Sequence, residues 1–113
     1  MTEREQITAA VRDYFEGWFD GDVERMDRAL HPELVKRHAG DELGVTTKQQ
    51  MLEWTAQHAG EEDGRDRALE IAVADVYEDI ANVTVCSAVY QEYVQLVRTS
   101  SGWKIANALW QYR

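Results

Sequence analysis

The chain has 113 residues, which is enough for one domain with one hydrophobic core. Hydrophobic residues make up 44% of it, which excludes a disordered chain, and its formal net charge of −9 disfavours anionic partners such as nucleic acids and membrane surfaces. The single cysteine, Cys86, excludes an intrachain disulfide. The N-terminal residues do not resemble a signal peptide and no apolar run is long enough to span a bilayer, so we expect a cytoplasmic protein.

The N-terminal segment has the pattern of an amphipathic helix. Thr2 followed by Glu5 matches a capping box, in which the two side chains bind the free amides at a helix start. Gly21 is suited to the left-handed residue that ends a helix. Between them, apolar residues at helical spacing predict one broad buried stripe: Ile7, Ala10, Val11, Tyr14, Phe15, Trp18 and Phe19.

Two shorter helices are predicted next. Asp22 can cap the first of them, which must end before Pro32 because the residue preceding a proline avoids the helical conformation. Residues 34–39 then form a short strand and residues 40–45 a loop. Thr47 begins a second capping box and with it the third helix.

From Ala68 onward the apolar residues alternate, as they do in strands. Turn residues at 78–79 and 99–102 divide this region into antiparallel strands, of which the last covers residues 103–112. Helices followed by a run of antiparallel strands indicate an α+β fold.

Two parts of the chain resemble a known family. These are Tyr14–Asp22 with the following Leu30–Lys36, and the closing hairpin of Glu92–Arg98 with Gly102–Asn107. Both resemble the group described as "putative lumazine-binding" in the nuclear transport factor 2-like superfamily. The resemblance covers essentially the whole chain and implies a single domain over residues 1–113. It implies a cystatin-like cone, in which three N-terminal helices pack on a curved antiparallel sheet around a pocket.

Ketosteroid isomerases share this fold. The resemblance places Tyr14 at the tyrosine that donates a hydrogen bond to the developing oxyanion. Arg37 and His38 lie near the position of the general-base aspartate, and Gln95 takes the position of the protonated aspartate. Both carboxylates of that mechanism are therefore missing, and we do not expect steroid isomerisation by it.

His38 is the best titratable candidate, because a histidine can act as acid or base near neutral pH. Together with Tyr14 as hydrogen-bond donor it could form a catalytic pair. The alternative is that His38 is an exposed residue of an edge strand. A buried Tyr14 hydroxyl could equally bind the backbone.

The closing hairpin suggests a pocket floor. If residues 99–102 form its loop, Arg98 faces Trp103 and Gln95 faces Ala106. One face then carries polar tips opposite small side chains, which leaves room for a mostly apolar ligand. The predicted ligand-binding residues are Trp18, Trp54, Tyr93, Gln95, Ala106 and Trp110, with Ala108 on the same face. The other face is apolar and predicts a homodimer formed through the sheet: Val94, Leu96, Trp103, Ile105 and Leu109.

Three functions remain open at this point. The first is a small-molecule-binding protein without catalysis, the second a cofactor-free isomerase, dehydratase or cyclase that uses His38 and Tyr14, and the third a dimerisation module. We expect no metal and no cofactor, because the sequence contains no metal-ligand spacing, no phosphate-binding loop and no dinucleotide fingerprint.

Overall fold

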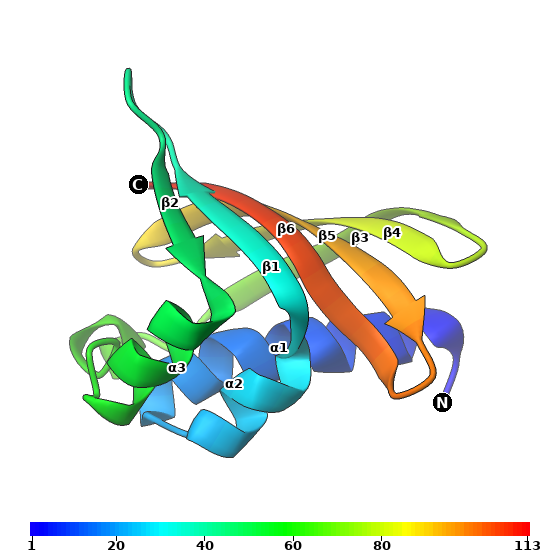
Figure 1. Cartoon of the computed structure of the whole chain (residues 1–113), viewed down its shortest axis with the longest axis horizontal. Coiled ribbons are helices and arrows are strands. Elements are labelled where there is room, and N and C mark those ends of the chain that lie inside the picture. The colour runs from blue at the N-terminus through cyan, green and yellow to red at the C-terminus, as the bar shows by residue number, and fades with distance from the viewer.

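In the computed structural model of the chain, which describes all 113 residues, the helices lie against one face of a curved sheet (Figure 1). The helical elements are α1 (Glu3–Asp20), α2 (Val23–Ala29), α3 (Lys48–Ala56) and the 3₁₀ helix η1 (Glu62–Arg65). The strands are β1 (Leu30–His38), β2 (Gly44–Thr47), β3 (Leu69–Tyr77), β4 (Ile80–Ser87), β5 (Tyr90–Thr99) and β6 (Gly102–Tyr112). The predicted α+β fold is confirmed.

Helix α1 has the ends that its sequence predicts. Thr2 and Glu5 form the capping box, and Gly21 ends the helix with a φ of 65°, in the left-handed region. Its buried side includes Tyr14 and Phe15, and it faces the sheet. Neither α1 nor any other helix is long and apolar enough to cross a bilayer.

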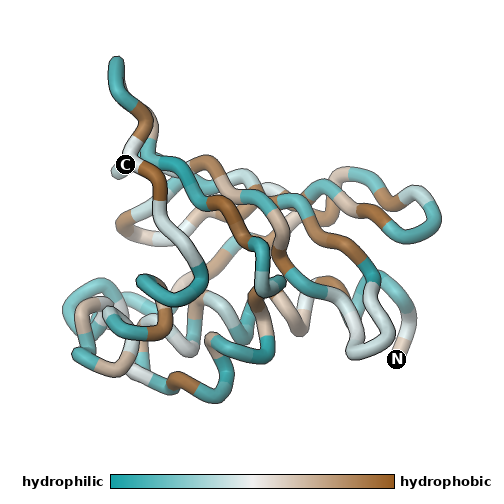
Figure 2. The backbone as a smooth tube through the Cα atoms, viewed as in Figure 1, coloured by the Kyte–Doolittle hydropathy of each residue, from teal (hydrophilic) through white to brown (hydrophobic).

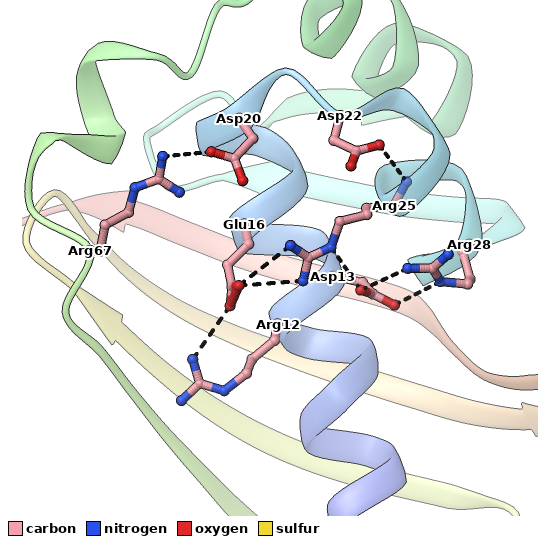
Figure 3. A network of polar contacts seen from close by, with 8 residues as sticks. All are labelled: Arg12, Asp13, Glu16, Asp20, Asp22, Arg25, Arg28 and Arg67. Carbon is pink, nitrogen blue, oxygen red and sulfur yellow. Dashed lines mark hydrogen bonds and ion pairs between the residues drawn. The ribbon is translucent and has the colours of Figure 1, made fainter.

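Acidic residues of α1 hold α2 in place (Figure 3). Asp13 accepts hydrogen bonds from Arg25 Nε and Arg28 Nε, both at 3.0 Å, and Glu16 lies 3.4 Å from Arg25. Burial alone would raise the pKa of Asp13, but the hydrogen bonds from Arg28 and Arg25 outweigh it and lower the pKa. These contacts fix α2 against α1.

The sheet has the strand order β2-β1-β6-β5-β4-β3 and does not close on itself. We expected a purely antiparallel sheet, but β1 runs parallel to β6, while every other pair is antiparallel. β1 and β6 can run parallel because no hairpin joins them. After the β1–β2 hairpin the chain passes through α3 and η1 and returns to the sheet at β3, on the opposite edge, so β6 reaches β1 only after three further strands. Residues 44–45, predicted as loop, belong to β2.

A β-bulge changes the register of the closing hairpin. Arg98 faces Trp103 as predicted, but Gln95 faces Asn107 instead of Ala106. Ala106 is the extra residue of the bulge, and bulges of this kind bend a strand and strengthen its twist. Beyond it, the even-numbered residues of β6 and not the odd-numbered ones turn toward the helices, as buried Ala108 shows.

Because of the bulge, the residues on each face of the hairpin differ from those predicted. Tyr93 and Gln95 are exposed on the outer face, away from the helices, so they do not share the inner face with Ala108 and Trp110. Residues expected on a dimer surface form part of the core instead: Val94, Leu96, Trp103 and Ile105 are all buried. Figure 2 shows hydrophobic and hydrophilic residues alternating along the strands, as expected for a sheet covered on one face.

Candidate functional site

A chain of three polar side chains lies between α1 and the inner face of the sheet. Lys36 Nζ, on β1, donates a hydrogen bond to Tyr14 Oη at 2.5 Å. The Tyr14 hydroxyl in turn donates to Glu92 Oε2, on β5, at 2.7 Å. Tyr14 comes from the middle of α1, so this chain links the long helix to two strands of the sheet.

Burial shifts the pKa of every member of this chain. Tyr14 is 3% exposed and Glu92 1% exposed. Burial raises the pKa of Glu92, although the charge of Lys36 and the hydrogen bond from Tyr14 oppose it. Burial lowers the pKa of Lys36 against the charges of Glu92 and Asp63, and it raises the pKa of Tyr14 well above its usual value, helped by the charge of Glu92. The tyrosine therefore keeps its proton at neutral pH.

Aromatic side chains enclose the three polar groups. The Trp110 ring centroid lies 5.3 Å from Lys36 Nζ, which is a cation–π distance. The remaining space is a cavity of about 10 Å³, roughly the size of one water molecule. Its lining consists of Tyr14, Phe15, Trp18, Lys36, Tyr90 and Glu92. The inner end of the cone is thus closed by its own side chains.

Asp63 of η1 ties two of these aromatic residues together. Its Oδ2 accepts a hydrogen bond from Trp18 Nε1 at 3.1 Å and another from the Tyr90 hydroxyl. Gly60 makes the close approach possible, since a Cβ at this position would collide with the Trp18 indole ring. The turn after α3 and η1, which we call the cover, therefore hold in place two of the rings that line the cavity.

His38 lies beside this cluster and makes aromatic contacts. Its ring stacks on Trp110 with centroids 4.3 Å apart, and its edge contact with Tyr112 is at 5.8 Å. The side chain is half-buried and shares its face of β1 with Lys36. No hydrogen bond joins it to Tyr14, so the structure brings the predicted pair into the same region without placing them in contact.

The other predicted ligand-binding residues fall into three groups. Trp18 and Trp110 lie at the inner cluster. Trp54 is 39% exposed on α3, and Tyr93 is 56% exposed on the outer face. There Gln95 exchanges hydrogen bonds with Asn82 at 3.0 Å and Asn107 at 3.2 Å. Ala106 borders a hollow of this same outer face. The prediction that Tyr93, Gln95 and Ala106 form the floor of an inner pocket is therefore wrong.

A wide hollow lies on the outer face. It measures about 660 Å³, is wide open to solvent, and includes Tyr93 and Leu109 in its lining. Its volume exceeds that of the inner cavity, but it is an open surface, whereas the inner cluster holds three titratable groups whose pKa values burial shifts. We therefore take the inner cluster as the candidate functional site, because perturbed titratable groups mark functional sites better than open surface does.

Sequence reasoning missed Lys36 and Glu92. One signal was available, since Glu92 lies two residues before Val94 and four before Leu96, so the three must share one strand face. A carboxylate on the most apolar face of β5 is unusual enough to suggest a buried partner. No three side chains of histidine, cysteine, aspartate or glutamate come together in a group that could hold a metal ion.

Comparison with known proteins agrees with this architecture. The family model described as "Putative lumazine-binding" matches residues 2–111. The chain belongs to this family. A comparison with curated protein sequences gives no significant match.

Solved structures show the same fold at low sequence identity. A nuclear transport factor 2-like protein of unknown function from Silicibacter pomeroyi is 18% identical, with a TM-score of 0.74 and full coverage of both chains. A ketosteroid isomerase-like protein from Erwinia carotovora atroseptica is 24% identical, with a TM-score of 0.68 over 94% of this chain and 92% of that one. A cystatin-like fold protein from Burkholderia xenovorans is 20% identical, with a TM-score of 0.62 over 97% and 91%. The predicted cystatin-like, nuclear transport factor 2-like fold is confirmed.

Proposed function

We propose that this chain is a small-molecule-binding protein whose site is the inner cluster around Lys36, Tyr14 and Glu92. The ligand is mostly apolar and lies between the aromatic side chains. An uncharged polar group of the ligand, such as a carbonyl or amide edge, binds Lys36 and Tyr14. No catalysis is assigned to this function.

The observation that carries the proposal is one cluster that joins a buried tyrosine and a buried glutamate to a half-buried lysine. Removing a charged lysine or glutamate side chain from water costs several kcal/mol, and well-packed apolar side chains would often give equal or greater stability. The cluster also lies beneath three rings, Trp18, Tyr90 and Trp110, that a flat ligand could stack against. A binding role would explain why the chain retains these groups despite the free energy that their burial costs.

Binding requires the cover to move, because the closed cavity has room for about one water molecule. The cover depends on Asp63, which belongs to a 3₁₀ helix of 4 residues. A short helix held by side-chain hydrogen bonds is the kind of element that opens at low cost.

The test is a titration followed by intrinsic tryptophan fluorescence, with lumazine as the first probe because the family's description names it. Its rings are flat and carry carbonyl edges. We expect saturable quenching, and we expect Tyr14→Phe to weaken binding by about 1–3 kcal/mol through loss of one hydrogen-bonding group. Tyr93→Phe on the outer face is the control and should bind as the unchanged protein does. Equal affinity in both variants would contradict the site.

A cofactor-free enzyme of the isomerase, dehydratase or cyclase kind is the second candidate. One observation favours it: the Tyr14 hydroxyl bridges an ammonium group and a carboxylate, an arrangement suited to proton transfer. His38, whose ring stacks on Trp110 at the edge of the site, would be the general acid or base.

A further inference from the structure

We propose that Lys36 binds an uncharged aldehyde or ketone covalently, through a reversible imine between its Nζ and the carbonyl carbon of the ligand. The inference rests on the proposed function, since it names the ligand class and the mode of attachment at the same site.

Lys36 differs from the other two lysines in what its amine contacts. Lys48 Nζ lies 3.0 Å from the Asp27 carboxylate and donates to the Leu30 carbonyl, and Lys104 Nζ donates to the Arg28 carbonyl at 2.6 Å. Lys36 Nζ contacts no carboxylate or carbonyl oxygen. Its neighbours are a phenol oxygen, a thioether sulfur and two aromatic rings: Tyr14 Oη at 2.5 Å, Met51 Sδ at 3.9 Å, and the Tyr14 and Trp110 ring centroids at 5.0 and 5.3 Å.

These surroundings favour a neutral, nucleophilic amine. An apolar environment disfavours the ammonium form, which is how lysines are activated for imine chemistry. The lowered pKa of Lys36, caused mainly by burial, agrees with this. Of the three lysines, only Lys36 thus has both an apolar surrounding and a cavity beside it.

Tyr14 supplies a path for the proton that Lys36 must lose. The ammonium can pass a proton to the Tyr14 oxygen while the Tyr14 hydroxyl passes its own proton to Glu92. The products are a neutral amine and a neutral carboxylic acid, which removes two charges from the interior. The raised pKa of Glu92 suits a group that accepts a proton here.

The covalent step balances without a cofactor. The amine lone pair forms the N–C bond, the carbonyl π pair moves to oxygen, and one proton passes from the nitrogen to that oxygen to give a neutral carbinolamine. The hydroxyl then takes a proton and leaves as water while the nitrogen lone pair forms the C=N bond, and the nitrogen gives up its remaining proton to leave the imine. Protonated Glu92, through Tyr14, can supply and take back these protons. Amine and carbonyl compound give imine and water, with no change of oxidation state.

The lining indicates an uncharged, apolar carbonyl compound. Once Lys36 and Glu92 are neutral, the charged group that remains in this region is the Asp63 carboxylate, which would repel an anionic keto acid. The aromatic walls favour a flat or hydrophobic body. Benzaldehyde has these properties and is the probe chosen.

The full chain is incubated with benzaldehyde and sodium cyanoborohydride at neutral pH, and the reduced adduct is located by peptide mapping. The possible sites are Lys36, Lys48, Lys104 and the terminal amine. We expect Lys36 to carry about tenfold or more label than either other lysine, as for a lysine activated by its pocket. Equal labelling of the three, or none at Lys36, would overturn the proposal.

Two variants and one further probe keep the outcome interpretable. Lys36→Arg retains the positive charge and should abolish the excess label, while Lys104→Arg should leave the label on Lys36 unchanged. Benzyl alcohol has the same ring without the carbonyl. Quenching of tryptophan fluorescence by benzyl alcohol or lumazine without excess label on Lys36 defeats this inference alone. If there is neither quenching nor excess label on Lys36, the proposed function is contradicted as well.

Discussion

The hydroxyl of Tyr14 donates a 2.7 Å hydrogen bond to the carboxylate of Glu92, 78 positions further along the chain. This one contact joins the longest helix to the middle of the sheet. It also places the Lys36–Tyr14–Glu92 hydrogen-bond chain between α1 and the inner face of the sheet.

Tyr14→Phe should destabilise the fold. The change removes one hydroxyl and leaves the Glu92 carboxylate, 1% exposed, without its hydrogen-bond donor. A buried acceptor left unpaired costs about 1–3 kcal/mol. Chemical denaturation should show this loss in the free energy of unfolding. Tyr77→Phe, at a position 68% exposed, is the matched control and should be neutral.

Stability should fall at alkaline pH because of Tyr14 and Tyr90. Burial raises the pKa of both, and the hydrogen bond and charge of Asp63 add to the shift of Tyr90. Above about pH 10 an unfolded tyrosine loses its proton while the folded one retains it, so the folded state binds more protons. The free energy of unfolding is therefore fully retained below that pH and decreases as pH rises toward the folded pKa values. Tyr14→Phe should make the decrease less steep; an unchanged slope would contradict the assignment.

Asp63→Ala should loosen the cover over the cavity. The change removes the acceptor shared by Trp18 Nε1 and the Tyr90 hydroxyl. We expect faster amide exchange in η1 and faster association of lumazine in stopped-flow fluorescence. Glu62→Ala is the neighbouring control, because its ion pair with Arg65 is highly exposed and contributes little. Equal behaviour of the two variants would show that Asp63 does not hold the cover.

Asp13→Ala should weaken the packing of α2 on α1. Its carboxylate, 18% exposed, binds two arginines, and hydrogen bonds to charged groups contribute about 1.5–3 kcal/mol. Because the pKa of Asp13 is lowered, its contribution is present above the unfolded value near 3.9 and is lost on acidification. Glu24→Ala, at an exposed position of α2, is the control. Urea titrations at neutral and acidic pH should show the largest difference at neutral pH.

A homodimer through the sheet remains a prediction, now carried by the outer face. Tyr93 and Leu109 are 56% and 45% exposed there and border the open hollow. Light scattering should give twice the chain mass of 13.0 kDa, and Leu109→Glu should halve it by placing a charge in the contact. A particle of 13.0 kDa for the unchanged chain at micromolar concentration would rule the dimer out.

Local sequence determined the elements of this fold and their ends. The capping boxes at Thr2 and Thr47 and the glycine at position 21 act within a few residues, so their geometry can be read without knowing what packs against them. The burial of Tyr14 on α1 follows from helical spacing alone in the same way.

Tertiary structure decided the site. The bulge at Ala106 shifts the pairing of β5 with β6 by one residue, and because side chains alternate with period two, such a shift moves each residue beyond it to the opposite face. The register of two strands depends on how the sheet bends around the helices, which no short stretch of sequence encodes. For the same reason Lys36, Tyr14 and Glu92, which are far apart along the chain, meet only once α1 has packed on the curved sheet.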